Sequence, residues 1–186
     1  MDLFEAIGLN RIAEVRRCIE AGADPNAPGP KGTLPVMAAL ETSIHFGNEG
    51  IPRLLCEAGA DTRLLMRTLT ERLRQGPASL LRYHNDTARD INGVLDAFKD
   101  IIRDLSPDEL ERLQAFIAEA EEFDGLSKAL RERAAELDDA LSNPDPTAAA
   151  PDTIDQAVEH LAQTFRFEMK AAALQMRAIA LRSLLD

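Results

Sequence analysis

The sequence predicts an all-α protein in which a short unit of two helical repeats is followed by long antiparallel helices. Three observations lead to this fold class. Aromatic residues make up 4% of the 186 residues and Trp is absent, whereas β-sandwiches and β-barrels depend on aromatic and β-branched side chains. Apolar residues recur at spacings of three and four along most of the chain, as on one face of a helix. The pentapeptide EAGAD occurs twice, at residues 20–24 and 57–61.

Each EAGAD segment follows an apolar run with helical spacing. The glycine at its centre, Gly22 or Gly59, can adopt the left-handed conformation that ends a helix. The aspartate then starts a turn by accepting hydrogen bonds from nearby backbone amides. Each copy is therefore predicted to be a helix that ends in a tight turn. The apolar residues of the two runs are Ile12, Val15, Cys18 and Ile19 in the first, and Ile51, Leu54, Leu55 and Cys56 in the second.

A further motif precedes the second run: residues 32–39 read GTLPVMAA, and Gly-Asn follows at residues 47–48. Together with the EAGAD segments, this pattern resembles the ankyrin repeat family, whose first helix opens with a Thr-Pro-Leu-His-x-Ala segment. Gly32 and Pro35 are among the matching residues. The resemblance covers about residues 2–62, with a partial first copy. It implies two antiparallel helices and a projecting finger in each repeat.

The two EAGAD segments are 37 residues apart, which exceeds the ankyrin period of about 33 residues by about one helical turn. The simplest account is a first helix of the second repeat that is one turn longer, at residues 41–44. Ankyrin-type proteins bind partners with finger tips and the inner helix face, so the resemblance implies partner contacts there and at the inserted turn. For Phe46, packing under the fingers is the alternative. The implicated residues are Asn26, Pro28, Lys31, Met37, Glu41, Ile44, His45 and Phe46.

No third copy follows the second EAGAD segment, although such repeats bury their faces only against neighbours and about three are needed for stability. The rest of the chain must cover the second repeat, so we expect capping helices in residues 63–105. The first of these is expected to end at the Gly-Pro pair of residues 76–77. A short helical piece at 78–83 and a polar turn at 84–86 follow, and a last helix reaches Leu105.

Residues 106–186 are predicted to form a long helical hairpin. Ser-Pro-Asp-Glu at residues 106–109 is a capping box that begins a helix extending to Leu141, with Gly125 as a place for a bend. Residues 142–152 contain three prolines and are expected to form a linker. A helix at about 153–185 has a matching length, which predicts antiparallel packing, with homodimeric pairing to a second copy as the alternative. Its buried side is expected to carry Ile154, Val158, Leu161, Phe165, Ala172, Met176 and Ile179.

The net charge of −11 argues against a nucleic-acid binder, because phosphate affinity rests on clustered Lys and Arg, and it suits a basic protein partner. The most acidic stretch is residues 107–143, with 11 acidic and 4 basic residues.

Cys18 and Cys56 are interpreted as core residues rather than as a disulfide framework. The chain begins without an apolar signal segment and contains no run of about 20 apolar residues. We therefore predict no membrane span and a cytoplasmic location, with a secreted effector lacking a signal peptide as the alternative.

No motif in the sequence predicts catalysis, a cofactor or a metal site. The three histidines lie in different segments, and no phosphate-binding glycine loop or nucleophile motif is present. The sequence thus predicts a non-enzymatic protein-binding module: an adaptor, an effector or an immunity-type inhibitor, in a bacterial setting because 17 of the 21 basic residues are Arg. One alternative is a homo-oligomeric coiled-coil scaffold. The other is a peripheral membrane adaptor that uses the last helix, where Arg166, Lys170 and Arg177 share one side.

Overall fold

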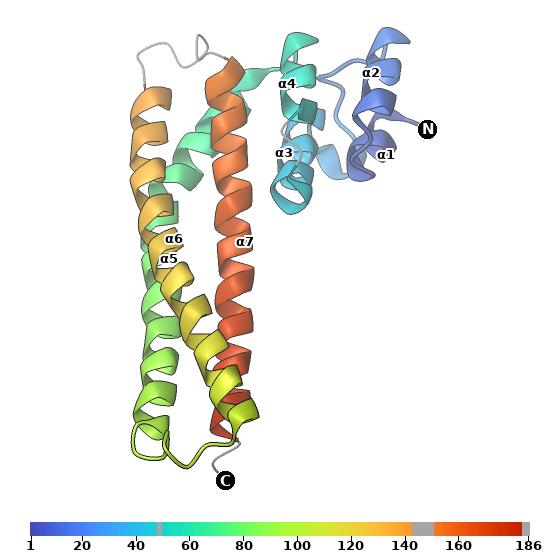
Figure 1. The fold of residues 1–186 in the computed structure, drawn as a ribbon. Helices are drawn as coiled ribbons and strands as arrows, with labels where there is room; N and C mark the ends of the chain where they lie inside the picture. Colours follow the sequence, from blue (N-terminus) through green and yellow to red (C-terminus); the bar gives the residue numbers. More distant parts are fainter. Residues whose placement is uncertain (48–49, 143–150, 184–186) are drawn as a thin grey trace. The chain divides into compact units, whose positions relative to one another are not determined.

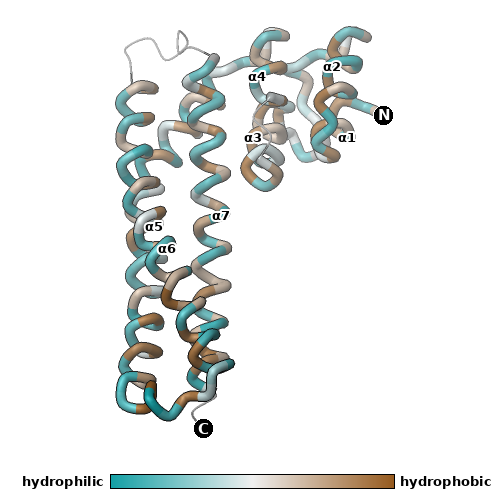
Figure 2. The backbone as a smooth tube through the Cα atoms, viewed as in Figure 1, coloured by the Kyte–Doolittle hydropathy of each residue, from teal (hydrophilic) through white to brown (hydrophobic). Residues whose placement is uncertain are grey.

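The computed structural model describes residues 1–47, 50–142 and 151–183, and within these ranges all regular structure is helical (Figure 1). This confirms the all-α class. The helices are α1 (Leu3–Gly8), α2 (Ile12–Glu20), a short 3-10 helix η1 (Pro30–Gly32), α3 (Pro35–Phe46), α4 (Gly50–Glu57), α5 (Thr62–Phe98), α6 (Pro107–Leu141) and α7 (Pro151–Arg182). Hydrophobic residues recur along the three long helices α5, α6 and α7, as the brown bands in Figure 2 show.

The chain forms two compact units, each with its own apolar core. The first unit comprises residues 1–76 and 133–165, and the second comprises residues 77–132 and 166–186. Each of the helices α5, α6 and α7 contributes one part to each unit. The sequence-based divisions after residues 62 and 105 do not coincide with these units, because the long helices are shared between them.

In the first unit, the two EAGAD segments fold into the same helix-ending turn. In each copy the glycine amide donates to the carbonyl three residues earlier, and the next alanine amide donates to the carbonyl five residues earlier, at 2.9–3.0 Å. Gly22 and Gly59 have φ angles of +90° and +91°, where a side chain would be strained. The predicted glycine turns are confirmed, and the sequence repeat is also a structural one.

The helix α3 has 12 residues, whereas its counterpart α1 has 6. The additional length includes residues 41–44, as the spacing of the EAGAD segments predicts. Helix α1 packs on α2 and α3, and α4 packs on α2 and α3. The four helices therefore form a small stack whose internal side chains, such as Ile7 and Leu40, are fully buried.

The outer side of the second repeat is covered by the three long helices within the first unit. One continuous core joins the buried side chains of α4 to apolar side chains from the parts of α5, α6 and α7 that belong to this unit. The prediction that later helices shield this side of the second repeat is confirmed. The covering residues are Leu65, Leu69 and Leu73 of α5, Leu137 and Leu141 of α6, and Ile154, Val158 and Leu161 of α7.

The helix α5 is continuous through Pro77. The predicted helix end at this proline, the short helical piece at 78–83 and the polar turn at 84–86 are wrong. A proline inside a helix removes one hydrogen bond and is unfavourable by about 3 kcal/mol. Burial on both sides outweighs this penalty, because Leu73 and Leu80 are 1% and 0% exposed in the cores of the first and the second unit.

The helix α5 also ends at Phe98 rather than at Leu105, and turns occupy residues 99–104. Ile101 and Leu105 are half-buried against the core of the second unit although they lie outside a helix. The apolar residues that predicted a longer helix are therefore explained by the packing of the segment that connects α5 to α6.

Helix α6 begins with the predicted capping box in the second unit. The amide and the hydroxyl of Ser106 donate to Glu109 Oε2 at 2.8 and 2.6 Å. These two hydrogen bonds favour the ionised carboxylate and lower the pKa of Glu109. The helix continues through Gly125 to Leu141, so the glycine does not end it. The single glycine is unfavourable by about 1 kcal/mol, which the packing of a long apolar side exceeds.

Helices α6 and α7 run antiparallel in the second unit, as predicted. Lys170 pairs with Glu122 at 2.8 Å, and Arg177 pairs with Glu119, so the residue numbers rise on one helix while they fall on the other. Helix α7 begins at Pro151. Most of the predicted linker, residues 143–150, lies outside the described residues.

The second half of α7 turns a different side towards the core than the sequence predicted. Ala172, Met176 and Ile179, which were expected to be buried, are exposed, at 66% for Met176 and 69% for Ile179. Residues 171–181 carry apolar side chains around most of the helix, so their periodicity cannot distinguish the two sides. The buried residues are instead Phe167, Ala171, Leu174, Ala178 and Leu181.

Candidate functional site

The finger of the first repeat is tied to the second repeat through Asn26. Its Nδ2 donates to the carbonyl of Gly59 at 2.9 Å, and its Oδ1 accepts from the amide of Asp61 at 2.6 Å. The Asn26 amide in turn donates to Asp24 Oδ1 at 2.8 Å. Both polar atoms of the Asn26 carboxamide are therefore engaged inside the protein. This residue, implicated in partner binding, holds the two EAGAD turns together.

The tip of the same finger presents Pro28 and Lys31, which are both exposed. The tip is closed by a hydrogen bond from the amide of Gly29 to the carbonyl of Thr33 at 2.9 Å. The ring of Phe4 lies so close to Gly29 that any side chain there would clash with it. The finger is therefore anchored on both sides, while Pro28 and Lys31 remain accessible at its tip.

The implicated residues of α3 divide between internal and external roles. Ile44 is 8% exposed and lies in the core. Met37 is half-buried against the same core. Glu41 is exposed and forms an ion pair with Arg72 of α5. Only the Glu41 carboxylate among these three offers an accessible polar group.

The end of α3 exposes the largest apolar side chain among the implicated residues. Phe46 is 66% exposed, so the alternative that it packs under the fingers is wrong. The neighbouring His45 ring stands edge-on to the ring of Phe165 of α7, with centroids 4.7 Å apart and an interplanar angle of 88°. Helix α3 ends at Phe46 and is capped by Gly47, whose φ of +70° is left-handed. The contact of His45 thus fixes the helix end from which Phe46 projects.

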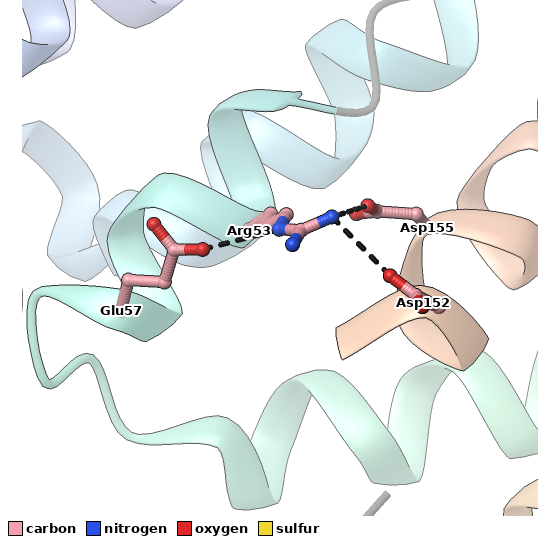
Figure 3. A network of polar contacts seen from close by, with 4 residues as sticks. All are labelled: Arg53, Glu57, Asp152 and Asp155. Atoms are coloured by element: carbon pink, nitrogen blue, oxygen red, sulfur yellow. Dashed lines mark hydrogen bonds and ion pairs between the residues drawn. The ribbon is translucent and has the colours of Figure 1, made fainter. Parts of the chain in front are cut away.

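A charged network fastens the second repeat to the start of α7 (Figure 3). The guanidinium of Arg53 donates to Glu57 Oε1 at 3.1 Å and to Asp155 Oδ2 at 3.0 Å, and its contact with Asp152 Oδ1 measures 3.4 Å. Sequence analysis missed this network because Arg53 and Asp155 are 102 residues apart in the chain. Nothing in the local pattern around either residue indicates the pairing.

Cys56 lies beside this network. Burial, with Asp155 and Glu57 as further causes, raises the pKa of its thiol to about 11. The thiol is therefore protonated and unreactive at neutral pH, in agreement with its interpretation as a core residue.

The second unit contains a groove between α5 and α6 that sequence analysis missed. His84 Nε2 lies 2.7 Å from Asp124 Oδ1, and the His84 ring stacks on Phe123 with centroids 6.1 Å apart. The prediction failed here because His84 was assigned to a turn rather than to a helix facing α6. We call this the α5–α6 groove; it has a volume of about 390 Å³ and is lined by His84, Ala88, Ile91, Asn92, Leu95, Ile117, Ala120, Glu121, Phe123 and Asp124.

A second groove of about 380 Å³ lies between α6 and α7 in the same unit. Its floor is apolar, and its two charged lining residues are Arg112 and Arg177, the latter already paired with Glu119. We call it the α6–α7 groove. The two grooves thus carry opposite charges at their edges.

No cofactor or metal site was predicted from the sequence, and the described residues contain no group of three or more His, Cys, Asp and Glu side chains placed to hold a metal ion. His160 is 3% exposed, and burial lowers its pKa to about 4, so its imidazole is neutral at pH 7. In the part of the chain that the structure describes, no helix is both long and apolar enough to cross a membrane.

No protein-family model matches the chain, and neither a curated protein nor a solved structure matches it. The resemblance to ankyrin repeats therefore rests on the residues of the chain itself, and it stays a prediction.

Proposed function

We propose that this chain is a non-enzymatic protein-binding module in which two ankyrin-like repeats, capped by later helices, present α3 and the finger to a partner protein. The adaptor, effector and immunity-type inhibitor classes all belong to this proposal. So do the bacterial setting and the cytoplasmic or secreted location that the sequence predicts.

The observation that carries the proposal is the 66% exposure of Phe46 at the end of a well-supported helix. Aromatic side chains, Phe among them, are enriched in protein interfaces relative to the rest of the protein surface. His45 packs on Phe165 behind it, and Glu41 pairs with Arg72 one turn earlier. A partner would therefore meet an aromatic anchor that needs little ordering on binding.

The net charge of −11 supports a basic partner. An excess of negative charge accelerates the encounter with a basic protein and makes the association sensitive to salt. A partner captured through Phe46 is thus expected to be released more readily at high ionic strength.

The test is affinity capture from the native cell, with mass spectrometry, of the wild-type chain and of Phe46→Ala. The matched control is Leu9→Ala, because Leu9 is a comparably exposed apolar residue, at 52% against 66%. We expect Phe46→Ala to lose the partner, and the purified complex to weaken by about tenfold or more, while Leu9→Ala binds as the wild type does. Equal capture by all three chains would overturn the proposal.

A second candidate function, a homo-oligomeric scaffold, is supported by the exposed apolar side chains of α7. Met169, Met176 and Ile179 are 58%, 66% and 69% exposed and recur at helical spacing. Light scattering at micromolar concentration tests this candidate. A dimer that Met176→Glu dissociates would support it, and a monomeric wild-type chain would exclude it.

The peripheral membrane adaptor has weaker support. Of the three basic residues that share a side of α7, Lys170 pairs with Glu122 and Arg177 pairs with Glu119, so only Arg166 offers an unneutralised charge to anionic lipids. Co-sedimentation with anionic vesicles tests this alternative directly.

A further inference from the structure

The α5–α6 groove combines an apolar floor with polar groups that are not used inside the protein. Glu121 and Asn92 line it, and neither side chain makes a hydrogen bond or an ion pair with any other described residue. Asp124 contacts His84 through Oδ1, and its side chain is 75% exposed, which leaves Oδ2 accessible. Two carboxylates and one amide therefore stand at the edge of the groove with free acceptor positions.

The floor of the groove offers apolar surface beside these acceptors. Leu95 is 37% exposed, and Ile91 and Ile117 are half-buried. Ala88 and Ala120, whose side chains are small, leave the space between the two helices open. The surface thus presents a hydrophobic strip that is bordered on the α6 side by negative charge.

The charged and titratable groups that line the groove limit the type of ligand. Among the described residues they are Glu121 and Asp124 on α6 and His84 on α5, and none of the described Lys or Arg residues lines it. A ligand that fits must bring a cation to the carboxylates and apolar groups to the floor. The long side chains of Lys and Arg meet the first need, because their apolar stems can lie on the strip while the charged ends reach the carboxylates.

We propose that the α5–α6 groove binds a cationic amphipathic helix of the partner protein. The apolar side of that helix packs on Ile91, Leu95 and Ile117, and a Lys or Arg side chain pairs with Glu121 and Asp124. Binding of an amphipathic helix in an apolar groove is a recurrent mode of peptide recognition, in which residues at helical spacing act as anchors. The proposal rests on the proposed protein-binding function and gives the chemistry of a second contact.

The neighbouring α6–α7 groove provides an internal comparison. It has nearly the same volume and is also lined mainly by apolar side chains, but its edge carries Arg112 and Arg177. Because Arg177 is paired with Glu119, the uncompensated charge at this edge is that of Arg112. A cationic helix therefore meets no carboxylate in the lining of the α6–α7 groove and two in that of the α5–α6 groove, so charge should direct the helix to the latter.

The experiment uses the full-length ¹⁵N-labelled chain and a 14-residue helical peptide of Leu and Lys, with Leu on one face. A matched peptide has Glu in place of every Lys. We expect the Lys peptide to shift the amide resonances of residues 88, 91, 92 and 95, and the Glu peptide to leave them in place. Shifts spread over the whole acidic surface, or no binding of the Lys peptide, would overturn the proposal.

The variants separate the groove from the overall charge. Glu121→Gln and the double variant with Asp124→Asn keep the shape of the groove, and we expect the double variant to bind the Lys peptide about tenfold more weakly. Glu111→Gln removes one negative charge, as Glu121→Gln alone does, but from an exposed position on α6 that does not line the groove, and it should have little effect. If Glu111→Gln weakens peptide binding as much as Glu121→Gln does, the attraction is non-specific and the proposal is wrong.

The outcome is distinguishable from a failure of the proposed function. Phe46 does not line the groove, so Phe46→Ala should bind the Lys peptide as the wild type does. If the peptide fails to bind while capture of a partner still depends on Phe46, the groove proposal is wrong and the protein-binding function stands. If the peptide binds in the groove and capture does not depend on Phe46, the groove proposal stands and the proposal that Phe46 anchors the partner is wrong.

Discussion

The two units of this protein are stabilised by different kinds of contact. The second unit holds four phenylalanines that are 2% exposed or less: Phe98, Phe116, Phe123 and Phe167. In the first unit, Phe46 is exposed and the repeats are joined by hydrogen bonds between the Asn26 side chain and backbone groups. The second unit thus buries large aromatic side chains, whereas the two repeats of the first unit are joined by hydrogen bonds from one side chain to the backbone.

The units also differ in how many polar groups they bury without a partner. Among the described residues of the first unit, Ser43, Asp155, His160 and Thr164 each have a buried polar atom with no hydrogen bond, whereas in the second unit only Ser127 does. An unsatisfied buried polar group lowers stability by about 1–3 kcal/mol. The first unit should therefore be the more sensitive to substitution of its buried polar groups, and the second to changes of core volume.

The largest expected effect is that of Phe123→Ala in the second unit. The Phe123 ring is 1% exposed and stacks on Phe167 with centroids 4.4 Å apart and an interplanar angle of 9°. Removing it leaves a cavity and should lower the free energy of unfolding by about 3–5 kcal/mol. Urea unfolding followed by circular dichroism measures this loss. The control is Leu95→Ala at an exposed position, which should change the free energy of unfolding by less than about 1 kcal/mol. A similar loss of stability in both variants would contradict the expected difference between buried and exposed positions.

A smaller effect is expected from pH in the first unit, through His160. Burial lowers the pKa of His160 from 6.5 in the unfolded chain to about 4 in the folded protein. Between these values the unfolded state binds a proton that the folded state does not, so stability is lost as the pH falls from 6.5 to 4. This group contributes at most about 3 kcal/mol to the loss.

The variant His160→Leu tests that contribution, because it removes the titrating group and the unpartnered Nδ1 atom together. We expect the free energy of unfolding, measured in urea at several pH values from 7 to 4, to fall less steeply with decreasing pH than in the wild type. Parallel curves for the two proteins would show that His160 is not responsible for the pH dependence.

The features that sequence predicted correctly are those that local chemistry determines. Gly22 and Gly59 end helices because the left-handed conformation is strained for other residues, and the capping box at Ser106 and Glu109 satisfies backbone amides within one turn. The longer α3 follows from the spacing of two identical segments. The prediction that later helices cover the second repeat followed from the need to bury the apolar outer side of that repeat.

The features that sequence missed are those that distant contacts determine. Pro77 lies inside α5 because leucines on both sides of it are buried, and the choice of face in α7 depends on which of two apolar sides meets the core. Of the implicated binding residues, Ile44 is buried and Asn26 is engaged, which no local pattern reveals. The pairing of His84 with Asp124 across two helices is equally invisible in the sequence.

The smallest of these effects is expected for Asn26→Ala, and it tests the polar side of the comparison. The substitution leaves the carbonyl of Gly59 and the amide of Asp61 to water, and it should lower the stability of the first unit by about 1–2 kcal/mol. Hydrogen exchange should show faster exchange of the Asp61 amide in the variant. Pro28→Ala changes the same finger but removes no such hydrogen bond, so it should leave the exchange rate of the Asp61 amide unaltered. Asn26→Asp keeps the acceptor for the Asp61 amide and should protect that amide partly. If the Asp61 amide exchanges equally in all four proteins, the two turns are not held by Asn26, and the first unit must depend on its apolar core as the second unit does.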